Sequence, residues 1–516
     1  MKIFYNCHIF DQSGDAFVEE NGKIIFVGDK EEAFQYDGEH IDLNGKYVYP
    51  GFNDSHMHVV NYGQFLSSVS LYEHTTSLQD VIDTLKENLV EGKWLKGRGW
   101  IHDYFTDVNR FPTRADLDTV STTTPIMITR ACGHICIANS KAIELANLKE
   151  PQEGDTYDLE NGIFKENAVY LISDACPQPT VEDINDYVFK AQDKLHEYGI
   201  TSVHSDDLLS ATSNYKDALT ALEQLKDENK LTVRIYEQSH FLDASTIQEF
   251  IDAGYNTGVG NEYFKIGPLK VLGDGSLGAR TAYLSRPYYD NPNTQGIPIY
   301  TKEHLYDMFK TAHTQNMQIA IHAIGDGILD WILDIYNDLL VKYPRDDHRH
   351  GVVHCQITRE DQLKEFERLN LHAYIQSIFI DYDNHIVEQR VIPETAQTSY
   401  NFKTLYDIAH CSNGSDCPVE YPDVLKGIQL AMTRTSIDGT GPYLKEQALS
   451  AKEAIYTFTK NGAFGSFEED VKGMIKEGMY CDFTVLDSEI ENTDVNAIKD
   501  IKVLETYVAG NCVYKN

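Results

Sequence analysis

The chain has few positive charges and no long apolar run. It carries 44 lysine and arginine residues against 80 aspartate and glutamate residues, a formal net charge of −36. Nucleic acid and anionic lipid are bound by Lys and Arg against phosphate, so this balance argues against both as partners. No stretch is apolar over the length of a membrane span. We therefore expect a protein that binds neither nucleic acid nor a membrane.

Several common signatures are also absent. Neither the phosphate-binding loop Gly-x-x-x-x-Gly-Lys-Ser/Thr nor the Gly-x-Ser-x-Gly turn of a serine nucleophile occurs. The nine cysteines are odd in number and form no Cys-x-x-Cys pair, which favours reduced thiols. The first residues lack the apolar core and the cleavage site of a secretory signal. These absences predict a cytoplasmic protein.

The sequence does contain the alternation of strand-like and helix-like segments that is typical of a large α/β protein. Its 516 residues suffice for two or three structural units. Short apolar segments alternate with amphipathic ones, as in parallel strands joined by helices, and eight candidate strands suggest a (β/α)8 barrel. The first candidate strand leads to His56, and the others are residues 200–204, 232–236, 269–272, 319–322, 352–354, 373–376 and 408–410. Candidate helices include residues 182–198, 211–229, 302–316 and 326–341.

The chain ends and one internal stretch lie outside this pattern. Residues 1–50 and 470–516 have too few strands each to bury a sheet face alone, so we expect them to pair in one small β-sandwich domain. The barrel is assigned to residues 51–64 and 181–469. Residues 65–180 exceed one crossover connection and are interpreted as an inserted subdomain, a candidate wall or lid over the barrel mouth.

Metal-binding side chains recur at the ends of the candidate strands. An extended strand turns His56 and His58 to the same side, as a shared metal ion requires. Because the carboxyl ends of barrel strands meet at one face, we expect the later candidates to converge on the same place. These stand at the ends of strands 4, 5 and 6 and after strand 8: Lys270, His322, His354 and Asp416. The ordered set favours a metal-dependent hydrolase.

In these residues the chain resembles the amidohydrolase superfamily, and within it the YtcJ-like group of metal-dependent hydrolases. The resemblance covers nearly the whole chain, and its motifs are specific as an ordered set rather than singly. It implies hydrolysis of an amide-type C–N bond by a metal-activated hydroxide, with one or two Zn2+ ions and with Mn, Fe or Co as alternatives. The matching segments are Pro50–His58, Lys270–Ala282, Ile321–Asp326, Val353–Gln356, Gly414–Asp416 and Gly478–Asp487.

The resemblance also assigns roles to the strand-end residues. His56, His58 and Asp416 would hold one ion, and His322 and His354 would hold a second. Asp416 would be the catalytic residue, because its carboxylate can take the proton from the attacking water and pass it to the leaving nitrogen.

Two residues compete for the bridge between two ions. Lys270 would serve if it is carboxylated by CO2, since an unmodified ammonium beside two cations would be repelled. Otherwise Lys270 stays cationic and pairs with Asp274 or the substrate. Glu166, in the segment Gly162–Ala168, is the alternative bridging ligand, and its other interpretation is an exposed charge that opens a helix.

Three residues are assigned to substrate binding. Asp274 and Arg280 lie in the glycine-rich loop after strand 4, where backbone can approach a ligand closely. His134 matches a family position near substrate, and a structural histidine is the alternative. Asp326, four residues past His322, would either orient that ring or start the next helix, the commoner use of Asp.

Two rival functions stay open at this point. A single-metal deaminase on the same fold would often carry a Glu near the strand 5 histidine, and Ile321–Asp326 contains none. A non-catalytic binding or regulatory relative would usually lack ligands, whereas every expected position here has a competent side chain. The sequence therefore predicts a zinc-dependent amidohydrolase for a small molecule, with an N-acyl or N-formyl amine and a homodimer suggested by the resemblance alone.

Overall fold

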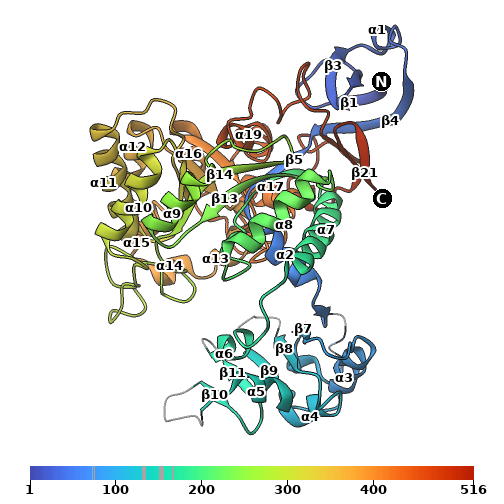
Figure 1. Ribbon diagram of the computed structural model, residues 1–516. Helices are drawn as coiled ribbons and strands as arrows, with labels where there is room; N and C mark the ends of the chain where they lie inside the picture. Colours follow the sequence, from blue (N-terminus) through green and yellow to red (C-terminus); the bar gives the residue numbers. More distant parts are fainter. Residues whose placement is uncertain (73, 75, 131–134, 150–155, 166–167) are drawn as a thin grey trace. The chain divides into compact units, whose positions relative to one another are not determined.

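The computed structural model describes residues 1–516 except 73, 75, 131–134, 150–155 and 166–167. The chain divides into two compact units (Figure 1). One comprises Met1–Tyr62 and Ala191–Asn516, and the other comprises Gly63–Lys190. None of the described helices combines the length and the apolar character that crossing a bilayer requires.

The first unit is built around a sheet of eight parallel strands, which confirms the predicted barrel. Neighbours in the sheet are also neighbours in sequence, as (β/α)8 connections require. The two end strands meet where the N–H of Asp416 donates to the carbonyl of His56 at 2.7 Å. In chain order the strands are β5 (Phe52–Met57), β12 (Ile200–Ser205), β13 (Arg234–His240), β14 (Phe264–Leu272), β15 (Ile319–Ala323), β16 (Gly351–His354), β17 (His372–Ile375) and β18 (His410–Asn413).

Strand register brings the candidate residues to one face of the barrel. Leu272 pairs with His322 across β14 and β15, and Ala323 pairs with His354 across β15 and β16. The helices between and after the strands are α7 (Val181–Glu197), α8 (Tyr215–Asp227), α9 (Ala244–Asp252), α10 (Lys302–Thr314), α11 (Asp326–Lys342), α12 (Glu360–Arg368), α16 (Phe402–Ile408), α17 (Val424–Thr433), α18 (Ala451–Thr457) and α19 (Lys460–Gly465).

Several predicted boundaries differ from the structure, among them those of the last barrel strand and of the helix predicted at residues 211–229. The last strand was expected at residues 408–410, but Ile408 ends helix α16 and the strand begins at His410. Short apolar runs do not distinguish a strand from the end of a buried helix, which explains the error. Helix α8 begins at Tyr215 because the side chain of Asn214 accepts from the N–H of Lys216 and caps it.

Strands from both chain ends form a seven-stranded sheet. Its order is β21-β20-β19-β4-β1-β2-β3, and the antiparallel pair of β4 with β19 joins the two ends. Phe4 lies 4.9 Å, between ring centroids, from both Phe17 and Phe483 in the core of this sheet. The strands are β1 (Lys2–Ile9), β2 (Ala16–Glu20), β3 (Lys23–Gly28), β4 (Glu39–Pro50), β19 (Phe483–Leu486), β20 (Val503–Val508) and β21 (Asn511–Lys515), with helix α1 (Lys30–Ala33) between β3 and β4.

The second unit has its own mixed sheet and core. The sheet order is β10-β11-β9-β8-β7-β6, and β8 spans Ile126–Arg130. Leu85, Trp100 and Ile128 are fully buried in its core. The elements are β6 (Val69–Ser70), α3 (Leu78–Glu87), β7 (Leu95–Trp100), α4 (Arg114–Asp118), β9 (Ile135–Ala138), α5 (Ser140–Ala146), β10 (Tyr157–Asp158), β11 (Ile163–Lys165) and α6 (Val169–Ser173).

A buried ion pair ties barrel strand β13 to the segment before β19. Arg234 Nε and Nη2 donate to the two carboxylate oxygens of Asp482 at 2.6 and 3.0 Å, and both side chains are buried. Asp482→Ala leaves this guanidinium unpaired and is expected to cost about 3–5 kcal/mol of unfolding free energy. A urea titration followed by circular dichroism should show a lower midpoint. The control is Glu360→Ala, which removes an exposed ion pair with Lys364 and should leave the urea midpoint unchanged. Equal shifts of the midpoint in the two variants would contradict the expected effect of Asp482→Ala.

Candidate metal centre

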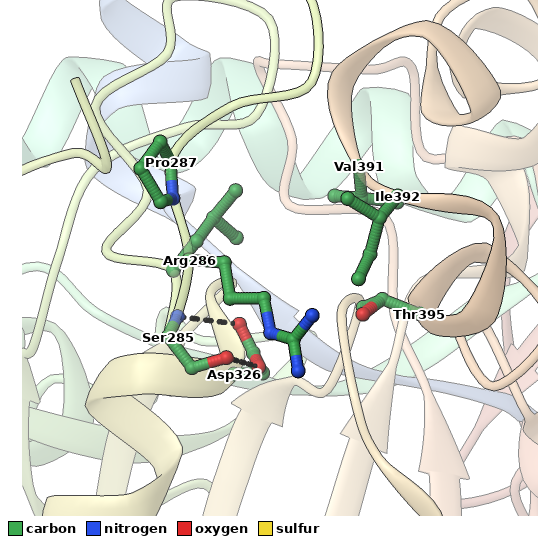
Figure 2. Close-up of a pocket in the computed structure, with 8 residues that line it drawn as sticks. Ser285, Arg286, Pro287, Asp326, Val391, Ile392 and Thr395 are labelled. Atoms are coloured by element: carbon green, nitrogen blue, oxygen red, sulfur yellow. Dashed lines mark hydrogen bonds between the residues drawn. The ribbon is translucent and has the colours of Figure 1, made fainter. Parts of the chain in front are cut away.

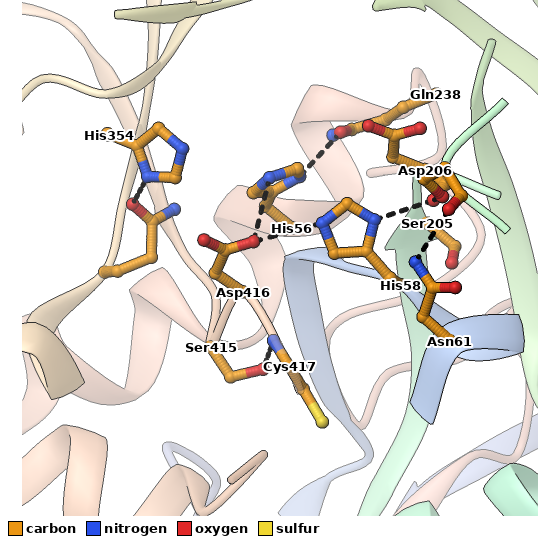
Figure 3. A network of polar contacts seen from close by, with 12 residues as sticks. His56, His58, Asn61, Ser205, Asp206, Gln238, His354, Ser415, Asp416 and Cys417 are labelled. Carbon is orange, nitrogen blue, oxygen red and sulfur yellow. Dashed lines mark hydrogen bonds and ion pairs between the residues drawn. The ribbon is translucent and has the colours of Figure 1, made fainter. Parts of the chain in front are cut away.

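Two histidines and an aspartate converge at the carboxyl end of the barrel (Figure 3). His56 stands near the end of β5, His58 directly precedes helix α2 (Val59–Leu66), and Asp416 follows β18. One ligand atom from each lies within 4.8 Å of the other two. Among the described residues this is the one group of three or more His, Cys, Asp or Glu side chains that meets this spacing.

The spacing of these atoms fits a bound cation. Nε2 of His56 and Nε2 of His58 lie 3.4 and 3.2 Å from Asp416 Oδ1. Ligand atoms about 2.0–2.2 Å from a tetrahedral zinc ion are about 3.4 Å apart, so both separations suit a shared ion. Imidazole and carboxylate donors also suit manganese, iron and cobalt.

Oxygen atoms behind the two imidazoles set their orientation. Nδ1 of His56 lies 2.7 Å from Oε1 of Gln238, and Nδ1 of His58 lies 2.8 Å from the carbonyl oxygen of Asp206. Nε2 of Gln238 donates to the carbonyl of Ser55 at 3.3 Å, which fixes the direction of the amide. Because these oxygens can only accept, Nδ1 carries the proton in each ring and Nε2 is the atom available to a metal.

His354 extends the cluster away from His58. Its Nδ1 lies 2.7 Å from Oε1 of Gln376, the same arrangement that holds His56. The ring centroids of His354 lie 5.5 Å from His56 and 4.4 Å from His322. Nε2 of His322 instead contacts the protein backbone, because it lies 3.1 Å from the carbonyl oxygen of Gly275. The structure therefore brings His354 to the cluster and engages His322 with the loop after β14.

Lys270 reaches the same cluster from β14. Its Nζ lies 3.2 Å from Nε2 of His56 and 3.3 Å from Oδ2 of Asp206. For a cationic Lys270 the sequence suggested Asp274 or the substrate as the partner, and the carboxylate that the structure places beside Nζ is that of Asp206. Asp206 was not singled out from the sequence, because an acidic residue after a strand resembles an ordinary loop residue.

Burial and neighbouring charge shift the ionisation of these groups in different directions. Burial, together with the charge of Lys270, holds the pKa of His56 well below its usual range, so that ring is neutral. Burial works to raise the pKa of Asp416, but the hydrogen bond with His58 and nearby positive charge lower it overall. Burial opposes protonation of His58, yet the contacts with Asp416 and Asp206 raise its pKa to about 9. A bound cation at Nε2 would replace that proton.

The backbone that carries Asp416 is packed against β5. Asp54 accepts from the N–H groups of His56 and Ser415 at 3.2 and 3.1 Å. Asp416 and His354 have backbone φ angles of 57° and 83°, a region that residues other than glycine rarely adopt. Such strain is concentrated at functional sites, where the surrounding structure enforces it.

Gly414 permits this close approach, and its replacement should disturb the centre. A Cβ at Gly414 would lie 2.5 Å from the backbone nitrogen of His56. Gly414→Ala is therefore expected to displace Asp416 and to lower kcat/KM about 100-fold, the scale of effect of a 1 Å misplacement. The control is Gly278→Ala, whose Cβ meets only Ile386 at 3.9 Å. Steady-state kinetics give kcat/KM for both variants. Equal values of kcat/KM for Gly414→Ala and Gly278→Ala would contradict the expectation.

The structure gives protein partners to the other sequence candidates. Asp274 accepts from the N–H groups of Ile324 and Gly325 at 3.1 and 2.8 Å, next to the start of helix α11. Arg280 pairs with Asp290 at 2.6 Å. Substrate contact by either residue stays a prediction, and His134 and Glu166 lie outside the described residues.

Asp326 starts helix α11 rather than orienting His322. It is the first residue of the helix, and its Oδ1 accepts from the N–H of Ser285 at 2.9 Å. Figure 2 shows this contact at the edge of a small pocket that Arg286 and Ile392 also line. Helix initiation was the commoner of the two uses expected for this residue.

Comparisons with known proteins agree with this geometry. A model described as "Amidohydrolase family" matches residues 39–514. The chain is 29% identical over 523 residues to YtcJ of Bacillus subtilis, covering 97% of this chain and 96% of that protein. It is 24% identical over 541 residues to N-substituted formamide deformylase of Arthrobacter pascens, covering 97% and 95%. An uncharacterized metal-dependent hydrolase of Pyrococcus horikoshii superposes with a TM-score of 0.82 at 31% identity, over 96% of this chain and 99% of that one.

Proposed function

This chain belongs to the amidohydrolase family, and we propose that it cleaves an amide-type C–N bond of a small molecule. The observation that carries this proposal is the convergence of His56, His58 and Asp416, with both imidazoles presenting Nε2. A divalent cation held there, for which we propose zinc, supplies a water molecule of lowered pKa and polarises the carbonyl of the substrate. The assignment as a metal-dependent hydrolase rests on the family and on its relatives.

Asp416 is the residue proposed to move the proton. Both of its contacts with the histidines use Oδ1, so we assign Oδ2 to accept the proton of the attacking water. The lowered pKa of Asp416 keeps it ionised and able to accept at neutral pH. The same oxygen then delivers the proton to the leaving nitrogen, which departs as an amine rather than as an amide anion.

N-substituted formamides are the proposed first substrates. The support is the similarity over nearly the whole chain to a deformylase of that class. The zinc-loaded protein should be offered N-formyl amines, N-acyl amines, ureas and cyclic amides, with amine and acid products measured together. We expect the formyl or acyl amines to be cleaved with equal release of amine and acid. Release of ammonia from ring amines alone would instead favour a deaminase, and turnover of none of these compounds would contradict the proposal.

A further inference from the structure

Asp206 lies beside the candidate metal centre, and the proposed proton transfers do not use it. It directly follows β12 and is 1% exposed. The charges of Lys270 and His240 outweigh its burial and hold the pKa of its carboxyl well below the usual range. A buried, ionised carboxylate is stable only where charged or hydrogen-bonding partners surround it. Its contacts therefore indicate what it does.

Asp206 contacts His58, Lys270 and His240, and Figure 3 shows the first of these contacts. Its backbone carbonyl accepts from Nδ1 of His58 at 2.8 Å, and its Oδ2 accepts from Nζ of Lys270 at 3.3 Å. Its Oδ1 lies 3.5 Å from Nδ1 of His240. His240 and Lys270 are cross-strand partners at the ends of β13 and β14. One residue thus contacts both His58 and Lys270.

The residues on either side of Asp206 hold the chain that follows His58. Ser205 Oγ accepts from the N–H of Val59 at 2.8 Å, and Asp207 Oδ1 accepts from the N–H of Val60 at 2.8 Å. These contacts satisfy the first free N–H groups of helix α2. Ser205–Asp207 therefore fix both the backbone and the imidazole direction at His58.

On the basis of the proposed function, we propose that Asp206 is a positioning residue of the metal centre. Its carbonyl turns Nε2 of His58 toward Asp416, and its carboxylate holds Nζ of Lys270 next to Nε2 of His56. A carboxylated Lys270 would keep one N–H from which Oδ2 could accept, but it would lose the positive charge that favours the ionised carboxylate of Asp206. Loss of such outer contacts typically weakens metal binding about 10–100-fold.

Three variants test this assignment. Asp206→Ala removes the carboxylate and leaves the carbonyl, and Asp206→Asn retains an acceptor oxygen for Lys270. The control is Asp227→Asn, which alters an exposed carboxylate paired with Lys226 at the end of helix α8. Zinc and cobalt affinities are measured by competition with a chromophoric chelator, together with the melting temperature. We expect Asp206→Ala to bind about 10–100-fold more weakly than the wild type, Asp206→Asn to recover most of that loss, and Asp227→Asn to bind as the wild type does.

The outcomes separate this inference from the proposed function. Wild-type affinity in Asp206→Ala, or an equal loss in Asp227→Asn, would show that Asp206 does not position the centre and would overturn the inference. A wild-type chain that binds neither ion would contradict the proposed function as well. If Asp206→Ala does not fold, Asp206→Ser replaces it under the same criteria, because Ser is too short to reach Lys270.

Discussion

Asp416→Asn is expected to lower kcat by about 10³-fold while the chain remains folded. The amide keeps the size of the side chain and an oxygen near His56 and His58, but it cannot take a proton from water. Asn also tolerates the left-handed backbone at this position, where φ is 57°. The loss therefore measures the proton transfer rather than a collapse of the centre.

The measurement is single-turnover and steady-state hydrolysis of the best formyl or acyl amine, with equal metal content in both proteins. Asp438→Asn is the matched control, because Asp438 is a largely exposed aspartate in the loop after helix α17 that pairs with His385 and accepts from the N–H of Thr440. A kcat for Asp416→Asn within a few-fold of the wild type would remove Asp416 from the role assigned to it.

Removal of divalent metal is expected to abolish hydrolysis. Binding to a cation lowers the pKa of water from about 15.7 to about 7, and no described side chain at the centre supplies an equivalent nucleophile. Addition of zinc, manganese or cobalt to the stripped protein should restore turnover. Magnesium should not, because it prefers a shell of oxygen atoms to the imidazoles of His56 and His58.

The assay follows amine release before chelation, after chelation and dialysis, and after each ion is returned. Circular dichroism of the stripped protein shows whether the barrel remains folded. Undiminished activity in a folded protein without detectable metal would contradict the metal-dependent account.

The sequence was most informative where chemistry and topology agree. The pair of histidines at His56 and His58 could be placed on one side of a strand, and the order of later candidates matched successive barrel strands. A parallel barrel brings strand ends to one face, so convergence of His56, His58, His354 and Asp416 followed from the fold class alone. The structure adds the 3.2 and 3.4 Å separations that this argument could not supply.

The outer contacts of the centre could not be predicted in the same way. Gln238, Gln376 and Asp206 are polar residues at strand ends, and no spacing in one sequence says which side chain faces which neighbour. The strand register in the folded barrel decides which of these side chains face the histidines. The ligand contact that the glycine-rich surroundings of Arg280 suggested stays a prediction, and its pair with Asp290 could not be predicted from the sequence.

Anomalous diffraction from a crystal of the protein soaked in zinc tests the central claim most directly. A peak at the zinc edge should lie about 2.0–2.2 Å from Nε2 of His56, Nε2 of His58 and a carboxylate oxygen of Asp416. No peak at these three atoms under saturating zinc, or a peak bound only elsewhere on the chain, would contradict the account.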